Sequence, residues 1–270
     1  THRLAPHALV WRKSQDALAD WLTTHAGSFD AVVFSGYLYS PSTQGLPAVS
    51  ALAPTILQPG KGGVPKLNEK GSFGYALASA GNQLFVGAPD AKISGRASAG
   101  AVAMLTFGTF GVTSGKLITQ ATKGVAGAPA TRNQFGFSLA ASDGYFAVGA
   151  IRDDVPGARD TGAVHLFRLA GSKVSPVKRI SQSSAVVPGK SEPEDWFGSA
   201  VAFGRVCPGV TGLVVGASSE VLRNDGEDDW PEGSAWLIPL KAPSACRAVQ
   251  FLAYLVSGHP GPAKPWRPRM

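Results

Sequence analysis

The sequence predicts an all-β protein made of a repeated sheet of four short antiparallel strands. A Phe-Gly pair occurs at positions 73, 135 and 197, at a constant interval of 62 residues. A regular interval of this kind is the signature of a repeat protein. Each copy contains runs of about 5–8 residues that suit strands and are short for helices. The 33 glycines and 20 prolines among 270 residues disfavour long helices.

The strands of each copy follow one another in the same order. In the first copy a tight Gly81-Asn82 turn separates the first two runs, and polar or glycine-rich stretches separate the others. The runs of the first copy are "FGYALASA", "QLFVGAP", "AVAMLTF" and "KLITQAT". Those of the second are "FGFSLAAS", "YFAVGA", "GAVHLFRL" and "VKRISQS", and those of the third are "GSAVAFG", "GLVVGAS", "GSAWLIPL" and "AVQFLAYLV".

Four antiparallel strands repeated at a fixed period are typical of the blades of a β-propeller. We expect the Phe of each Phe-Gly pair to fill the gap between blades. The Gly of Val-Gly-Ala would let strands approach closely where a side chain does not fit. The expected organisation is a propeller over residues 1–255, with a degenerate first blade at 1–66, clear blades at 67–128, 129–190 and 191–255, and a basic Pro-rich tail at 256–270.

The order of Phe-Gly, Val-Gly-Ala and a later Gly-Ala-Val strand resembles the FG-GAP repeat of integrin α subunits and of many bacterial extracellular proteins. The resemblance covers about residues 73–240. Calcium-binding copies of that family carry an Asp-rich loop between strands one and two. Here those loops read "SAGNQ", "ASDGY" and "FGRVCPGVTG", in which Asp143 is the single acid. Calcium needs six to eight oxygen ligands, so the family's calcium site is not carried over to this chain. No cofactor is expected, with calcium as the alternative.

The number of blades is open. At 62 residues a blade, the chain holds about four, whereas integrin-type propellers have seven and closed propellers typically have four to eight. An open arc would leave unpaired edges. Three arrangements remain: a compact four- or five-bladed ring that uses residues 1–72, a seven-bladed ring completed by a second chain, or self-association.

Two cysteines, Cys207 and Cys246, lie in the loop between the first two strands of the third copy and between its last two strands. Both positions fall on one face of the same blade. We predict a disulfide, which implies an oxidising compartment. Two buried free cysteines are the alternative.

The opposite face, formed by the loops between strands two and three and by the blade connections, gathers acids. They come from "IRDDVPGARD", "SEPEDW" and "RNDGEDDWPEG". Such a face could attract a basic partner, and a solvated polar rim is the alternative. Trp196 is expected to be buried beside Phe197, and Trp230 to be exposed. The predicted binding residues are Asp153, Asp154, Asp160, Asp195, Asp225, Glu227, Asp228, Asp229 and Trp230, with no metal site.

Several function classes are disfavoured. Five of the seven excess positive charges lie from Lys241 onward, without a basic stripe on a folded face, so nucleic acid is not an expected partner. No stretch approaches the ~20 apolar residues of a membrane span. The common hydrolase, metalloprotease and nucleotide-binding motifs are absent from the sequence. His165, in mid-strand, is expected to be a packed residue.

The leading hypothesis is a secreted or extracytoplasmic propeller that binds a protein or carbohydrate ligand through its acidic loop face. The Ala- and Gly-rich composition suggests a bacterial source. The first alternative is a propeller enzyme, a hydrolase, lyase or cyclase acting in the central funnel, for which no catalytic residue is assigned. The second alternative is a structural subunit that completes a partner's propeller.

Overall fold

The structure is a computed structural model, and it describes residues 32–33, 55–56, 63–67, 72–108, 111–142, 144–221, 233–241 and 246–252. These residues form strands and no helix, which confirms the all-β prediction. No helix within these ranges could cross a membrane. Asp143, residues 222–232 and the Pro-rich tail lie outside the described residues.

The chain divides into two units, Thr1–Lys66 with Leu105–Gly115 and Leu67–Met104 with Lys116–Met270. In the first unit, β1 (Val32–Val33) pairs in parallel with β2 (Thr55–Ile56). The expected degenerate blade at 1–66, like the other blade boundaries, stays a prediction. The second unit carries the site described below.

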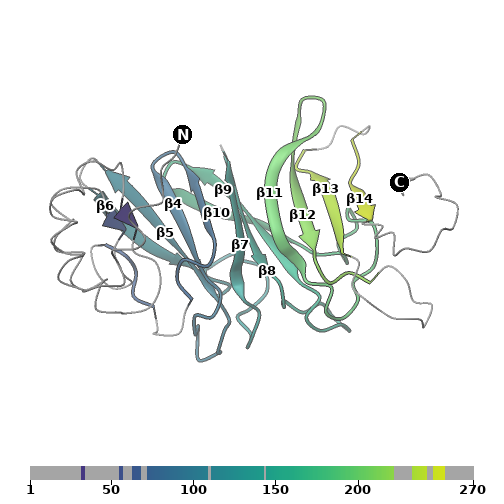
Figure 1. The fold of residues 1–270 in the computed structure, drawn as a ribbon, viewed down its shortest axis with the longest axis horizontal. Coiled ribbons are helices and arrows are strands. Elements are labelled where there is room, and N and C mark those ends of the chain that lie inside the picture. Colours follow the sequence, from purple (N-terminus) through teal and green to yellow (C-terminus); the bar gives the residue numbers. More distant parts are fainter. Residues whose placement is uncertain are drawn as a thin grey trace, which may run out of the picture. The chain divides into compact units, whose positions relative to one another are not determined.

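Three four-stranded antiparallel sheets follow the repeat, as expected for propeller blades (Figure 1). In each sheet neighbouring strands are consecutive in the chain. The first blade contains β3 (Leu77–Ala80), β4 (Gln83–Ala88), β5 (Ala101–Gly108) and β6 (Gly111–Ile118). The second contains β7 (Phe135–Ser142), β8 (Tyr145–Ala150), β9 (Ala163–Ala170) and β10 (Lys173–Ile180). The third contains β11 (Phe197–Cys207), β12 (Val210–Ala217), β13 (Ser234–Pro239) and β14 (Val249–Leu252).

Each junction between blades is formed by the two repeated glycine motifs. The strand β7 lies against β3 and β4, and β11 lies against β7 and β8. A Cβ on Gly87 would overlap the carbonyl oxygen of Gly136, and one on Gly149 would overlap that of Gly198. Only a residue without a side chain allows two backbones to approach so closely. The Val-Gly-Ala glycine of one blade therefore seats the Phe-Gly pair of the next.

The phenylalanines of the second and third Phe-Gly pairs lie in the cores, whereas Phe73 of the first pair is partly buried. Phe135 and Phe197 are fully buried. The ring of Phe135 meets His165 edge-on at 5.2 Å between centroids, and that of Phe197 meets Trp236 at 5.1 Å. His165 and Trp236 therefore occupy equivalent places in successive blades.

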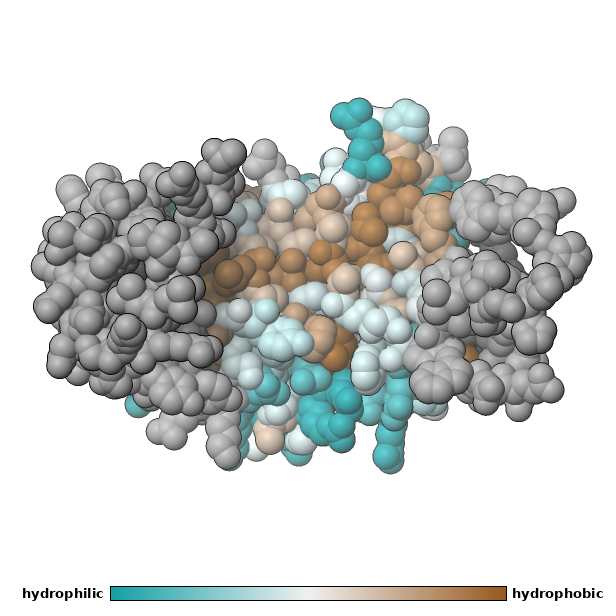
Figure 2. All heavy atoms as spheres, in the orientation of Figure 1, coloured by the Kyte–Doolittle hydropathy of each residue, from teal (hydrophilic) through white to brown (hydrophobic). Residues whose placement is uncertain are grey.

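The connections between blades lie at the same end of the sheets as the loops between strands two and three, as the repeat predicts. The amide of Phe135 donates to the carbonyl of Ala99 at 3.1 Å, and that of Phe197 donates to Thr161 at 2.9 Å. These bonds join each blade connection to the loop between strands two and three of the preceding blade. Among the described residues, apolar side chains gather over the strands and hydrophilic ones at the loops (Figure 2).

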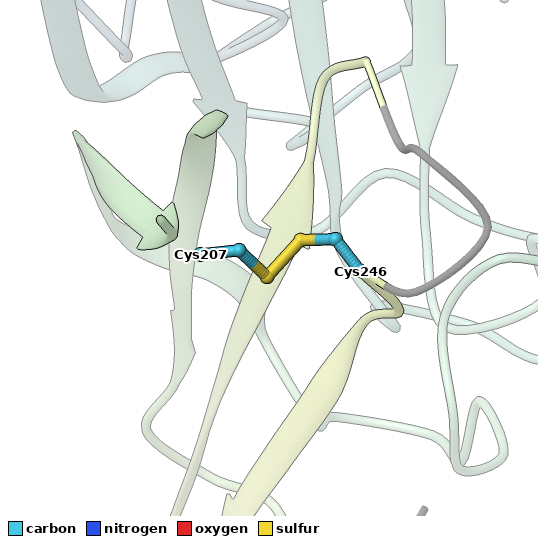
Figure 3. Close-up of a disulfide and its surroundings, with 2 residues drawn as sticks. All are labelled: Cys207 and Cys246. Atoms are coloured by element: carbon cyan, nitrogen blue, oxygen red, sulfur yellow. A yellow bond between two sulfur atoms is a disulfide. The ribbon is translucent and has the colours of Figure 1, made fainter. Parts of the chain in front are cut away.

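The predicted disulfide is present. Cys207 ends β11, and Cys246 lies between β13 and β14 (Figure 3). Their Cα atoms are 6.2 Å apart, and the bond spans 39 residues of sequence. Closing a loop of that length stabilises a fold by about 4 kcal/mol in the chain-entropy model. The bridge ties the outer strand of the third blade to its inner hairpin, at the end opposite the blade connections.

Candidate functional site

The structure separates the predicted binding residues into buried and exposed groups. Asp153 and Asp195 are buried. Asp154 is exposed, and Asp160 is partly exposed. The remaining predicted ligands, Asp225, Glu227, Asp228, Asp229 and Trp230, lie outside the described residues. A binding role for all of them stays a prediction.

Asp153 lies at the centre of a group that we name the second-blade polar cluster: Gln120, Asn133, Asp153, His165 and Arg179. Its Oδ2 accepts a hydrogen bond from Arg179 Nε at 2.8 Å and contacts His165 Nε2 at 3.2 Å. Its Oδ1 accepts one from Asn133 Nδ2 at 3.2 Å. The carboxylate is therefore surrounded by donors and paired with a guanidinium.

The protonation of Asp153 follows from these contacts. Burial favours the neutral acid and is the largest single influence. The hydrogen bond to His165 and the charge of Arg179 together outweigh it, and they hold the pKa of Asp153 below its usual range. Asp153 is thus a structural anion. His165 is 2% exposed, so a substrate could not reach its ring without displacing the residues above it.

A second group, which we name the third-blade polar cluster, consists of Gln182, Asp195, Glu220, Ser234 and Gln250. The Nε2 of Gln182 donates to Glu220 Oε2 at 2.6 Å, and Gln250 Nε2 approaches Glu220 Oε1 at 3.4 Å. Asp195 Oδ2 accepts the backbone N–H of Glu192 at 2.6 Å. Two buried carboxyl groups occupy this cluster, and no arginine or histidine of the described chain is bonded to either.

Burial raises the pKa of both carboxyl groups in the third-blade polar cluster. Burial raises the pKa of Asp195 to about 7; the Glu192 backbone bond opposes this rise, and the Glu192 charge adds to it. Burial, reinforced by the charge of Asp195, raises the pKa of Glu220 to about 8. Among the described residues, no group of three or more His, Cys, Asp or Glu side chains is placed to hold a metal.

A third group, which we name the loop-face patch, is partly exposed and consists of Arg152, Asp154, Asp160 and Trp196. The guanidinium of Arg152 lies 5.3 Å from the ring centroid of Trp196 and 3.8 Å from the carboxylate of Asp160. Asp154 Oδ1 accepts the backbone N–H of Asp160 at 2.8 Å. Trp196 is only partly buried. The patch presents both signs of charge and an aromatic ring in a fixed arrangement.

Several of these backbones adopt positive φ angles. Asp160 has a φ of 52° and Trp196 one of 57°. The equivalent residues of the preceding repeat, Ser98 and Gln134, have φ values of 49° and 55°. Because the conformation recurs at the 62-residue interval, it belongs to the loop geometry of the repeat and is not peculiar to this patch.

The sequence reasoning missed most members of the two clusters. Gln120 and Gln182 are 62 residues apart, as are Asn133 and Asp195, so the repeat interval could have identified them. The interval could not have identified Glu220, the counterpart of Asp153. The β11–β12 hairpin is longer than the β7–β8 hairpin, so the two residues are more than 62 positions apart. The missed residues are Gln120, Asn133, His165, Arg179, Gln182, Glu220, Ser234 and Gln250.

Comparison with known proteins supports the repeat. Residues 118–167, from the end of β6 into β9, match the FG-GAP repeat. No curated protein matches the chain. One similar solved structure is a Saccharomyces cerevisiae complex of a Dbp5 variant with Nup159, a Gle1 variant, IP6 and ADP. It is 12% identical, with a TM-score of 0.34, and the match covers 65% of this chain and 35% of that one. A similarity at that level carries no argument about function.

Proposed function

We propose that this chain, whose second blade is an FG-GAP repeat, is a non-catalytic binding module of a secreted or extracytoplasmic protein. Its ligand would be a protein or a glycan, held on the loop-face patch, with the acids of residues 222–232 as further predicted contacts. The observation that carries the proposal is the partly exposed contact of the Arg152 guanidinium with the Trp196 ring, beside the carboxylate of Asp160. The disulfide supports an oxidising compartment.

The physical argument rests on preorganisation. Arginine and tryptophan are enriched among the residues that dominate binding energy in protein interfaces. A cation held over an aromatic ring keeps one orientation, so less side-chain entropy is lost when a ligand binds. The patch mixes Arg152 with Asp154 and Asp160, and such mixed charge suits a peptide surface better than a neutral sugar. A protein ligand is therefore favoured over a glycan.

The test is a selection of binders from a random peptide library and a glycan array, both probed with the full chain. Arg152→Glu removes the contact with the ring and reverses a charge of the patch, and we expect it to weaken the selected binders at least ~10-fold. The matched control is Arg205→Glu, an exposed arginine on β11 away from the blade connections. Binders that tolerate Arg152→Glu, or lose affinity equally with both variants, would reject the proposal.

A second candidate function is the completion of a larger propeller, and the two ends of the blade array favour it. Tyr75 and Leu77 of the first blade are 54% and 56% exposed, whereas Leu139, the equivalent of Leu77 in β7, is 9% exposed. At the third blade, the described residues that a Cβ on Gly216 would meet belong to its own β11. The equivalent Gly149 is covered by the next blade.

These two ends are complementary, since one presents a Phe-Gly strand and the other a seat for it. A second copy or another FG-GAP chain could join head to tail at this seat. Light scattering on the full chain tests the idea. We expect a concentration-dependent dimer or larger species, which Gly216→Val should reduce to monomer. A monomer at every concentration, without a partner chain, would count against self-association.

A further inference from the structure

The second-blade and third-blade polar clusters occupy the same place in the repeat. Asp153 follows Ala150 by three residues, and Glu220 follows Ala217 by three. In the sheet register, Arg179 pairs with His165, and Gln250 pairs with Trp236. Each member of one cluster can therefore be compared with its counterpart in the other.

The comparison shows that the third cluster has lost its positive charge. The guanidinium of Arg179 has the neutral amide of Gln250 as its counterpart. His165 is replaced by Trp236, whose Nε1 donates to the carbonyl of Pro188 at 2.9 Å, away from the acids. In addition, Asn133 is replaced by a second acid, Asp195. Two ionised carboxylates without a cation would be costly in a buried site.

The hydrogen bonds indicate how the cost is avoided. In the second cluster, Asn133 Nδ2 donates to Gln120 Oε1 at 3.0 Å. In the third, Gln182 is 2% exposed and its Nε2 is committed to Glu220 and to the carbonyl of Lys190, at 2.6 and 2.9 Å. Its Oε1 is buried and has no hydrogen-bond donor. An ionised Asp195 has no proton to offer this oxygen, whereas a carboxylic acid reproduces the donor of Asn133.

We propose that the third-blade polar cluster binds one proton, held on the carboxyl group of Asp195 and donated to Gln182 Oε1. Glu220 remains the carboxylate of the pair because both of its oxygens face amide N–H groups. The proton reduces the negative charge of the third cluster, as the guanidinium of Arg179 does in the second. Burial raises the pKa of both acids, to about 7 for Asp195 and about 8 for Glu220, which supports a proton retained by the pair. The hydrogen bonds, and not these values, assign that proton to Asp195.

The other charged groups that act on the pair are few. The loop before β11 contributes Glu192, whose charge favours protonation of both acids. Burial raises the pKa of Glu192 itself, and the charge of Lys190 opposes that rise. The described residues of β12, β13 and β14 contribute only the neutral side chains of Ser234 and Gln250 to the cluster.

The proposal predicts a stability that falls as the pH rises. The folded pKa of Asp195 is above its unfolded value, so the native state binds more protons than the unfolded chain between about pH 4 and 7. Stabilisation by the proton is complete below the unfolded pKa and is lost as the pH rises through the folded pKa. The site is therefore a pH-sensitive contact between the segment that precedes β11 and the residues that follow β12.

The experiment compares the full chain with Asp195→Asn, which copies Asn133 and cannot titrate. Thermal unfolding is followed from pH 5 to 9 at constant ionic strength. We expect the Tm of the wild type to fall by on the order of 5 °C over this range, and that of Asp195→Asn to fall by less than half as much. Glu194→Gln, which removes an exposed acid of the same loop, should behave like the wild type.

Infrared spectroscopy tests the proposal on the wild type alone, so the test holds even if the variant does not fold. The wild type at pH 6 should show the carbonyl band of a protonated carboxylic acid, which disappears by pH 9 and is absent from Asp195→Asn. A wild-type Tm that is flat with pH, or a spectrum without the acid band, would overturn the proposal. Full recovery of the pH 9 Tm by millimolar CaCl₂ would also overturn it, because a metal cation would then neutralise the pair.

Discussion

The second-blade and third-blade polar clusters share a backbone position and differ in how they balance charge. The second pairs one carboxylate with a guanidinium, at 2.8 Å between Asp153 Oδ2 and Arg179 Nε. The third buries two carboxyl groups, of Asp195 and Glu220, without such a partner. The first blade fills the corresponding place with the apolar side chains of Ala91 and Leu117. The repeat therefore fixes the geometry of the site and leaves its chemistry free.

The two clusters should respond to pH with opposite signs. The pKa of Asp153 is lowered in the folded chain, so its contribution to stability is present above the unfolded pKa and is lost on acidification. The pKa of Asp195 is raised, so its contribution is lost as the pH rises. A chain that carries both clusters is thus stabilised most between the two transitions.

The largest effect is expected from a substitution at the junction between the second and third blades, where two backbones lie in close contact. Gly149→Ala places a Cβ against the carbonyl oxygen of Gly198 and the hydroxyl of Ser138. Because a backbone must move to make room, we expect a loss of about 4 kcal/mol or more in the free energy of unfolding. Urea denaturation at pH 7 measures it.

The matched control is Gly204→Ala on β11, where a Cβ would meet nothing within 4 Å and the backbone φ is not positive. We expect a change within about 0.5 kcal/mol of zero there. Equal losses at Gly149 and Gly204 would show that the junction between the second and third blades tolerates an added methyl group, which contradicts the close approach.

A smaller loss of stability is expected when the equivalent residues Arg179 and Gln250 are replaced, and the two losses compare the clusters directly. Arg179→Met removes the cation of Asp153, and we expect a loss of about 3 kcal/mol at pH 7, because an unpaired buried charge remains. The counterpart Gln250→Met removes only long amide contacts and should cost about 1 kcal/mol. Chemical denaturation of both variants provides the comparison.

Adding Asp153→Asn to Arg179→Met should restore part of the loss, since the double variant has no unpaired anion. A double variant that is less stable by the sum of the two single effects would show that Asp153 and Arg179 do not interact energetically. The clusters would then differ in composition without differing in electrostatics.

Much of the fold could be predicted from the sequence because the repeat makes each copy a check on the others. Phe73, Phe135 and Phe197 set the interval, and the glycine of Val-Gly-Ala marked the junctions. The disulfide of Cys207 and Cys246 followed from the placement of both residues at one end of one blade. The buried positions of Asp153 and Asp195 did not follow, since a run of acids in a loop gives no sign of which side chain turns inward.

The sequence by itself determined the strand order, the repeat and the end of the sheets at which the loops gather, because these depend on periodicity and on local turn chemistry. Only the tertiary structure decided which polar residues meet, because Gln120, Asp153 and Arg179 come from three segments of the chain. Their contact depends on how the second blade folds together and on the loop before it. Burial then decided their charge, since removing a carboxyl group from water favours the proton unless a cation stands beside it.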